Sequence, residues 1–367
     1  ILFLTKMKGV KIMKAILKRE IKNFLKNPIF WAGLLIMVAG IYQILQPYLE
    51  LHYFTSNAEI QNMSVSSLED ADVMEGYIPV SDEERTENGY EEIYRTMTED
   101  MGLTTEEANE AISSIRGMNT EEACDYLEKE YRYYGAQYSL EGSKYKQGDA
   151  NEVNTYIQKK MQEHPYSYYF ARKYADFAGL FMAFFATILL AFLFLRDTRK
   201  DTYELLHTKP IAPWQYVLGK VGSGFLILMM ALAVLTLVFG GLCLGKGLSQ
   251  GFSVNLLDFL VADIVYIMPN MLMIVCVYAI AALIFKNPLP ATPLLFLYII
   301  YSNMGGTGAD GRYGYQGRLL SIIVRFPGRF FDTEMPPMLV LNQTFLILAS
   351  IVIVCIGIVI WNRRRVY

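Results

Sequence analysis

Long apolar runs alternate with polar segments along this chain, and the runs decide its architecture. Most of them reach or approach the roughly 20 residues that an α-helix needs to cross the hydrocarbon core of a bilayer. The fifth run is shorter and rich in proline. The pattern predicts an all-α integral membrane protein with six transmembrane helices. The six runs are residues 29–46, 175–195, 221–244, 256–285, 289–303 and 339–361.

Residues 1–28 form a basic segment with helical periodicity. Lysines and arginines are numerous, Glu20 is the lone acidic residue, and apolar residues such as Ile16, Leu17 and Phe24 recur at helical spacing. This pattern is typical of a cytoplasmic amphipathic helix that lies on the inner leaflet. No small-residue cleavage site follows the first apolar run, so we expect that run to be retained as a transmembrane helix.

A polar insert, residues 47–172, separates the first two spans, and residues 173–367 hold the other five. Between Glu50 and Glu163 the insert contains 26 acidic and 9 basic residues, a net charge of −17, so the rest of the chain carries +14 of the total of −3. Basic loops stay in the cytoplasm, so we expect both termini inside and the insert outside. Such an acidic domain is not expected to bind nucleic acid.

The insert carries signals for helices. Two Thr-Glu-Glu-Ala motifs, at Thr105 and Thr120, place carboxylates in the first turn, where the helix dipole favours them. They predict helices over about 105–116 and 120–134, separated near Gly117. We therefore expect a large, mainly helical extracytoplasmic domain.

Composition agrees with a membrane protein. The 367 residues are 53% hydrophobic and only 19% charged, and the mean hydropathy is +0.25. This balance is too apolar for an ordinary soluble protein of this length. Of the four cysteines only Cys124 lies outside the apolar runs, which leaves the polar domain without a disulfide framework.

The connection between the second and third spans, residues 196–220, is unusually rich in charge for a short loop. Asp201 to Thr208 is predicted to form a short amphipathic helix, which Pro210 ends. Trp214 and Tyr216 are then expected at the membrane boundary, with Lys220 extending its ammonium group toward water.

The connection between the last two spans, residues 304–338, begins with many glycines and continues into the apolar stretch LLSIIVRFPGRFF. This stretch is too short to span a bilayer, and Arg325, Pro327 and Arg329 interrupt it. We expect it to form an interfacial or re-entrant helix on the outer side.

Two polar residues fall within the fourth apolar run. Asp263 is the acidic residue expected below the lipid headgroups, and Asn270 follows Pro269 deeper in the span. Polar groups inside a membrane commonly mark a transport path, so both are candidates to line one. The alternative is that Asp263 lies close enough to the interface to be solvated by water.

No catalytic or metal-binding constellation is expected. All three histidines lie outside the apolar runs, and no spacing typical of zinc ligands occurs. Residues 240–246 fit part of a phosphate-binding loop, but Gly247 stands where Ser or Thr would ligate magnesium, and an apolar span precedes the motif instead of a strand. The chain is therefore not expected to be an enzyme or to bind a nucleotide cofactor itself.

Two stretches resemble one membrane-protein family. LLHTKPIAPWQYVLGK, Leu205 to Lys220, is similar to the coupling segment of ABC-2-type exporter permeases, and KREIKNFLKNPIFW, Lys18 to Trp31, is similar to the cytoplasmic helix that precedes their first span. The resemblance implies a permease that works with ABC ATPase subunits, which bind ATP and Mg²⁺, and with a second permease as a homodimer or heterodimer. The residues it implies for contact with the ATPase are Asp201, Glu204, Leu205, Leu206, His207, Lys209, Pro210 and Trp214.

The resulting hypothesis is an exporter subunit in the cell membrane of a bacterium. It would move a peptide, a lipid-like antibiotic or an ion outward by alternating access, surrounded by membrane lipids. Two alternatives remain at this point: a membrane-anchored sensor or receptor whose outer domain binds a ligand, and an intramembrane enzyme. The absence of mid-span catalytic groups disfavours the enzyme.

Overall fold

The computed structural model describes residues 2–61, 63, 71–142, 145–195, 211–307, 313–315, 317–333 and 335–363. The chain divides into two compact units. Unit 2 is Glu50–Glu163, and unit 1 comprises residues 1–49 and 164–367. Unit 2 is narrower than the insert expected at 47–172, because the helix of the second span begins as early as Tyr166.

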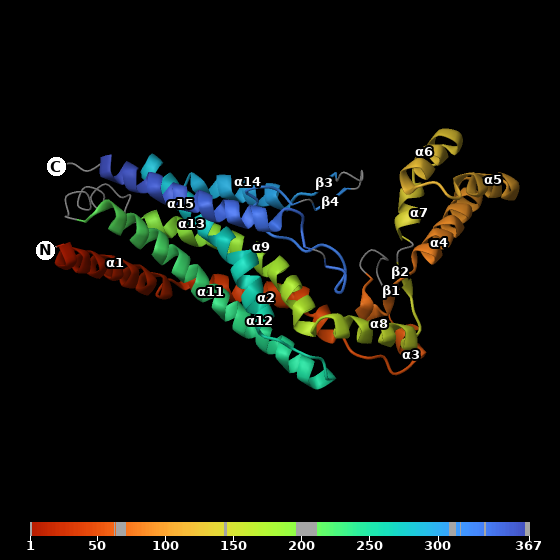
Figure 1. Ribbon diagram of the computed structural model, residues 1–367, viewed down its shortest axis with the longest axis horizontal. Helices are drawn as coiled ribbons and strands as arrows, with labels where there is room; N and C mark the ends of the chain where they lie inside the picture. The colour runs from red at the N-terminus through yellow and green to blue at the C-terminus, as the bar shows by residue number, and fades with distance from the viewer. Residues whose placement is uncertain are drawn as a thin grey trace. The chain divides into compact units, whose positions relative to one another are not determined.

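Unit 1 is a bundle of long helices (Figure 1). Among the described residues of unit 1, five helical segments are long and apolar enough to cross a bilayer. A further helix, α14, has 13 residues and is about 20 Å long, which is short of the hydrocarbon thickness. The fifth expected span is therefore a shorter helix than the others. The bundle contains α1 (Leu2–Leu25), α2 (Pro28–Leu45), α9 (Tyr166–Leu195), α11 (Pro213–Gln250), α12 (Leu257–Val261), the π-helical turn η4 (Ala262–Ile267), α13 (Met268–Phe285), α14 (Ala291–Asn303) and α15 (Leu339–Arg363).

Two ends of the bundle are named by chain connectivity. At the terminal end α1 begins, α9 ends, α11 begins and α15 ends (Figure 1). At the insert end α2 ends, α9 begins, and the connection from α14 to α15 is made. The short strands β3 (Gly306–Thr307) and β4 (Tyr313–Gly314) pair in that connection.

Helix α9 is the centre of the bundle. It contacts α2, α11, α12, α13 and α14. About two-thirds of the residues in its most apolar 18-residue stretch are buried. Glycines on α2 let it approach closely: a Cβ atom at Gly33 would lie 2.5 Å from the ring of Phe185, and one at Gly40 would lie 2.6 Å from Phe181. The two Phe rings thus occupy notches that only glycine provides.

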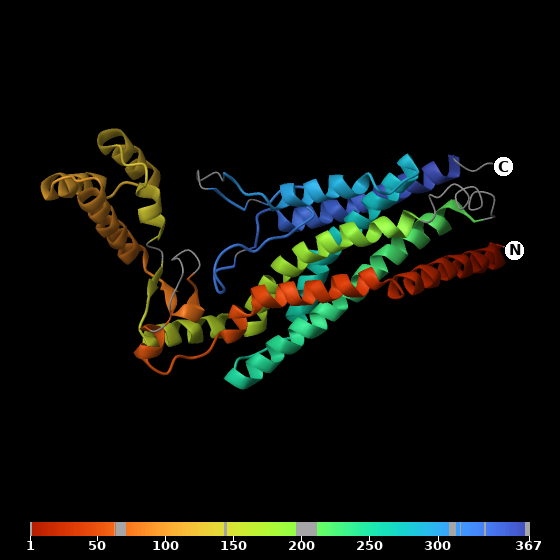
Figure 2. The same ribbon diagram turned by 180° about the vertical axis from the view of Figure 1, so that it is seen from behind.

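Helix α1 packs against the first half of α11 (Figures 1 and 2). The expected amphipathic helix is present, but its apolar face contacts protein: Ile16 and Leu17 lie over Gly219 and Gly222 of α11. Asn27 separates α1 from α2, and its side chain accepts a hydrogen bond from the backbone N–H of Ile29.

Helix α11 is longer than the span expected at 221–244. It begins with Pro213 in its first turn, where a missing N–H does no harm, and Gly251 ends it with a left-handed φ of 74°. Tyr216 and Lys220 are therefore helical and buried. The expectation that Lys220 reaches water is wrong, because its side chain lies inside the bundle. The expectation that Tyr216 lies at the level of the membrane boundary stays a prediction.

Unit 2 is mainly helical, as expected, with one small antiparallel sheet that pairs Tyr77 with Gln147. Its hydrophobic core includes Ile93, Met97, Ile115 and Leu127. Its elements are α3 (Asn57–Gln61), η2 (Val73–Glu75), β1 (Tyr77–Pro79), α4 (Asp82–Arg95), the π-helical turn η3 (Thr96–Asp100), α5 (Thr105–Ile115), α6 (Thr120–Tyr131), α7 (Ala136–Gly142), β2 (Tyr145–Gln147) and α8 (Ala150–Glu163).

The predicted helix starts in unit 2 are present and are capped. Thr104 and Asn119, each one position before the expected threonine, form capping boxes with Glu107 and Glu122. The hydrogen bonds from the Thr104 backbone and hydroxyl hold the pKa of Glu107 below its usual value. The ionised form of Glu107 thus stabilises the start of α5.

This cap makes unit 2 sensitive to acid in a defined window. Because the folded pKa of Glu107 is lowered, its contribution is complete above the ordinary glutamate pKa and is lost as the pH falls through the folded value. Glu107→Gln should therefore lower the melting temperature of the full chain more at neutral pH than in acid. Glu106→Gln, which removes the same charge without touching the cap, is the control. An effect of Glu107→Gln that does not change with pH would contradict the assignment.

Candidate functional site: an inserted loop and the ends of the bundle

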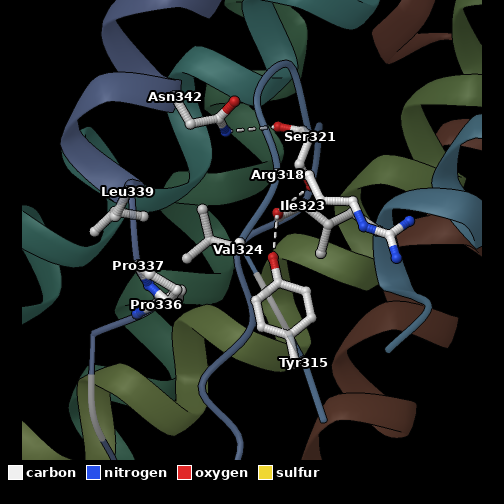
Figure 3. Close-up of a pocket in the computed structure, with 10 residues that line it drawn as sticks. Tyr315, Arg318, Ser321, Ile323, Val324, Pro336, Pro337, Leu339 and Asn342 are labelled. Atoms are coloured by element: carbon white, nitrogen blue, oxygen red, sulfur yellow. Dashed lines mark hydrogen bonds between the residues drawn. The ribbon is translucent and has the colours of Figure 1, made fainter. Parts of the chain in front are cut away.

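The connection from α14 to α15 packs against the helices of the bundle. We call its residues 317–333 the inserted loop (Figure 3). The expected interfacial or re-entrant helix within 304–338 is absent from the described part of that connection. Leu320 and Gly328 adopt left-handed φ values of 64° and 99°, which a right-handed helix cannot contain, and Pro327 adds a further break. Most of the apolar residues of the loop are nevertheless buried, namely Ile322, Ile323, Val324, Phe326, Phe330 and Phe331, whereas Leu319 and Leu320 are exposed.

Side chains from the surrounding elements satisfy the irregular backbone of this loop. The Asn342 amide donates to the carbonyl of Ser321 at 2.9 Å, and the Tyr315 hydroxyl donates to the carbonyl of Ile323 at 3.2 Å (Figure 3). Burial raises the pKa of Tyr315, so its hydroxyl keeps the proton that it donates. The backbone N–H of Ile322 donates to the Ser302 hydroxyl of α14. Non-helical backbone in a bilayer needs such partners within the protein.

Charged residues in the first turns of α9 hold the rest of the loop. The Lys173 ammonium donates to the carbonyls of Phe326 and Gly328, and Arg172 donates to the carbonyl of Thr333. Asp176, only 2% exposed, accepts from the guanidinium of Arg325. Arg325 also donates to the Asn303 side chain at the end of α14, so one loop side chain joins two helices.

Aromatic contacts close the insert end around the loop. The ring of Phe330 stacks on Tyr48, with 5.3 Å between centroids, and also packs against Tyr166 and Tyr169. A small pocket beside the loop, lined by Tyr315, Asn342 and other residues (Figure 3), has room for about one water molecule. Aromatic side chains from α9 and from the residues after α2 therefore pack against the loop at the insert end.

The candidate path residues of the fourth span are buried within the bundle. Asp263 is 7% exposed and accepts a 2.5 Å hydrogen bond from the Thr236 hydroxyl of α11, so protein surrounds most of this side chain. Tyr174 of α9 lies 3.1 Å from the Thr236 hydroxyl. Asn270 is 1% exposed and donates to the carbonyl of Tyr266.

A buried ion pair joins three helices at the terminal end. The Lys220 ammonium of α11 lies 3.0 Å from the Glu20 carboxylate of α1 and 3.2 Å from the carbonyl of Leu193 near the end of α9. Lys220 is 2% exposed and Glu20 is 9% exposed. Nearby, the ring of Tyr216 stacks on Trp361 of α15 with centroids 3.7 Å apart. We call these contacts the Lys220 junction.

The Lys220 junction joins the end of α9 to the first turns of α11, and these two helices flank the connection predicted to contact an ATPase. Trp214 is in the first turn of α11 and is 36% exposed. The structure thus brings together the two helix ends that flank the connection. The other candidate contact residues, Asp201, Glu204, Leu205, Leu206, His207, Lys209 and Pro210, lie outside the described residues.

Sequence reasoning missed the paired charges of the bundle. The sequence shows Glu20 only as a lone acid among lysines, and Lys173 falls just before the second span expected at 175–195. One signal was available for α9: its aromatic and small residues continue a helical pattern upstream of that position. For Arg325 the sequence carried no signal of its partner.

The five bilayer-length helices and the buried polar contacts among them define a multi-pass membrane protein. The family model described as ABC-2 family transporter protein matches residues 14–311. The chain belongs to this family, whose members are membrane transport components that generally work with ABC ATPase subunits. Comparison with curated proteins and comparison with solved structures found no match.

The Arg325–Asp176 pair should be essential for holding the loop. Asp176→Asn leaves the Arg325 charge without its carboxylate, and breaking a buried ion pair in this way costs about 3–5 kcal/mol. Because Arg325 is partly exposed, with 22% of its side chain accessible, we expect the lower end of that range. The measurement is the melting temperature of the purified protein, and the double variant Asp176→Asn with Arg325→Gln should recover part of the loss. If the loss in the double variant equalled the sum of the losses in Asp176→Asn and Arg325→Gln alone, the two side chains would not interact.

Proposed function

We propose that this chain is the transmembrane permease subunit of an ATP-driven exporter and that a separate ABC ATPase binds the connection between α9 and α11. The observation that carries the proposal is the Lys220 junction. The buried Lys220 ammonium belongs to α11, which follows that connection. It contacts α9, which precedes the connection, and also α1. Family membership supports the transport role, and the loop sequence resembles a coupling segment.

The junction gives the ATPase a mechanical route into the bundle. A push on the connection acts on the last turn of α9 and the first turns of α11. Lys220 passes that displacement to Glu20 of α1, and the stack of Tyr216 on Trp361 passes it to α15. Charges buried together move together, because separating them exposes each to a low dielectric.

The connection itself supplies the contact surface in this proposal. Leu205 and Leu206 are the apolar anchors, and Asp201, Glu204 and Lys209 form ion pairs at the rim. Interfaces of this kind depend on a few buried anchors. ATP and Mg²⁺ bind to the ATPase, so this chain needs no nucleotide site.

The inserted loop is the element that opens in an alternating-access cycle. Access alternates when one end of a path closes as the other opens. Specific hydrogen bonds to α9 and α14 hold the loop, and such ties can release together. Asp263 and Asn270 are polar positions that face the interior of the bundle, which suits a substrate path. A second permease, identical or related, completes the path.

The proposed orientation follows the charge distribution. The terminal end, with its basic residues, faces the cytoplasm, and unit 2, with a net charge of −17, lies outside. Cargo then moves outward. A peptide, a lipid-like antibiotic and an ion all remain compatible with the bundle.

The test separates binding of the ATPase from transmission of its motion. Leu205→Asp with Leu206→Asp should release the ATPase during co-purification, because the anchors are lost. Lys220→Met should leave the ATPase bound but should abolish the stimulation of ATP hydrolysis by the permease. Lys18→Met removes an equal charge from the exposed face of α1 and should leave both properties at the wild-type level.

Two results would overturn the proposal. One is that the wild-type protein, purified from its native membrane under mild conditions, brings down no ATPase. The other is that the double Asp variant retains the ATPase and full activity. The first result would favour a sensor whose function resides in unit 2, and the second would show that the ATPase does not bind through Leu205 and Leu206.

A further inference from the structure

Asp263 is a buried carboxyl group whose hydrogen bonding is incomplete. Its Oδ2 atom accepts from Thr236, and the Tyr174 hydroxyl is hydrogen bonded to the same group. Its Oδ1 atom is buried and has no hydrogen-bond partner among the residues that the structure describes. A buried carboxylate oxygen normally has a hydrogen-bond partner, so Oδ1 is the atom of this group that can take up a proton.

No cation balances a charge at Asp263 within the described residues. The cations of α9 are directed elsewhere: Lys173 and Arg172 bind carbonyls of the inserted loop. Arg325 of that loop pairs with Asp176. An isolated carboxylate in an apolar bundle is very costly, and such a group becomes neutral by taking up a proton.

The other titratable groups near Asp263 are also engaged. On its own helix, Asp258 accepts a hydrogen bond from Ser167 at 2.5 Å, and Tyr266 packs on Phe326. On α11, the nearest titratable side chain toward the insert end is the buried thiol of Cys243. Tyr174 is therefore the titratable group in direct contact with Asp263.

The backbone around Asp263 has the geometry of a functional position. Asp263 lies in the π-helical turn Ala262–Ile267, which ends two positions before Pro269. A proline removes one backbone hydrogen bond of the helix, and a π turn is a common way to accommodate the break. Such turns occur frequently at functional sites, because they widen the helix and redirect side chains.

We propose that Asp263, together with Thr236 and Tyr174, is a proton-binding site of the bundle. A proton binds at Oδ1 and is released when α9 and α11 move apart from the π turn and admit water. The bound species is a proton rather than a metal ion, because the site offers few oxygen atoms. No group of three or more His, Cys, Asp or Glu side chains suited to a metal occurs among the residues that the structure describes. This proposal does not depend on the export direction or on the ATPase.

Infrared spectroscopy of the full chain in lipid nanodiscs tests the proposal. A protonated carboxyl group has a carbonyl-stretch band that a carboxylate lacks. The wild type should show this band at mildly acidic pH, where exposed aspartates are already ionised, and it should disappear reversibly as the pH is raised. Asp263→Asn should lack the band, and Asp258→Asn, one turn away, should retain it. Labelling aspartate carboxyls with ¹³C assigns the band in the wild type, so the test does not rely on the folding of one variant.

Thr236→Val distinguishes a working site from a buried structural group. Thr236 donates to the carboxyl group and favours its ionised form. Its removal should move the loss of the band to higher pH. A band that persists unchanged until the protein unfolds would overturn the proposal, as would the absence of any band assigned to Asp263. A band that disappears when Na⁺ is added at constant pH would also overturn it, because the site would then bind a metal ion.

Discussion

Backbone groups outside helices must find partners inside the protein when water is absent, and this constraint organises the bundle. The inserted loop places irregular backbone between membrane-spanning helices. Lys173 and Arg172 satisfy its carbonyls, while Asp176 holds its arginine. The charges at the start of α9 are therefore part of the fold, although they lie in a segment that becomes a span.

A buried charged side chain also joins helices at the terminal end. Lys220 is a buried cation that contacts a carboxylate on one helix and a backbone carbonyl on another. Helix α9 takes part at both ends, through residues 172–176 and through Leu193. Because α9 also contacts α2, α11, α13 and α14, a displacement at one end has a continuous packed path to the other. Asp263 lies along that path, against Tyr174 of the same helix.

The sequence predicted the features that local patterns encode. Apolar length revealed the long spans, and capping motifs located α5 and α6 to within a few residues. Local patterns could not predict the tertiary ion pairs, since Glu20 and Lys220 lie 200 positions apart and Asp176 and Arg325 lie 149 apart. The inserted loop was mistaken for a helix because its apolar content suggested burial. Left-handed backbone at Leu320 was not visible in that pattern.

Side chains of the surrounding helices hold the inserted loop inside the bundle, and this is the central claim. Amide hydrogen exchange of the full chain in lipid nanodiscs tests it most directly. The account predicts that the amides of Ile322 to Phe326 exchange as slowly as those in the middle of α9. The exposed turn at Met118 in unit 2 provides the fast reference. Exchange in the loop as fast as in that turn would contradict the account, because it would show a loop that lies open to water.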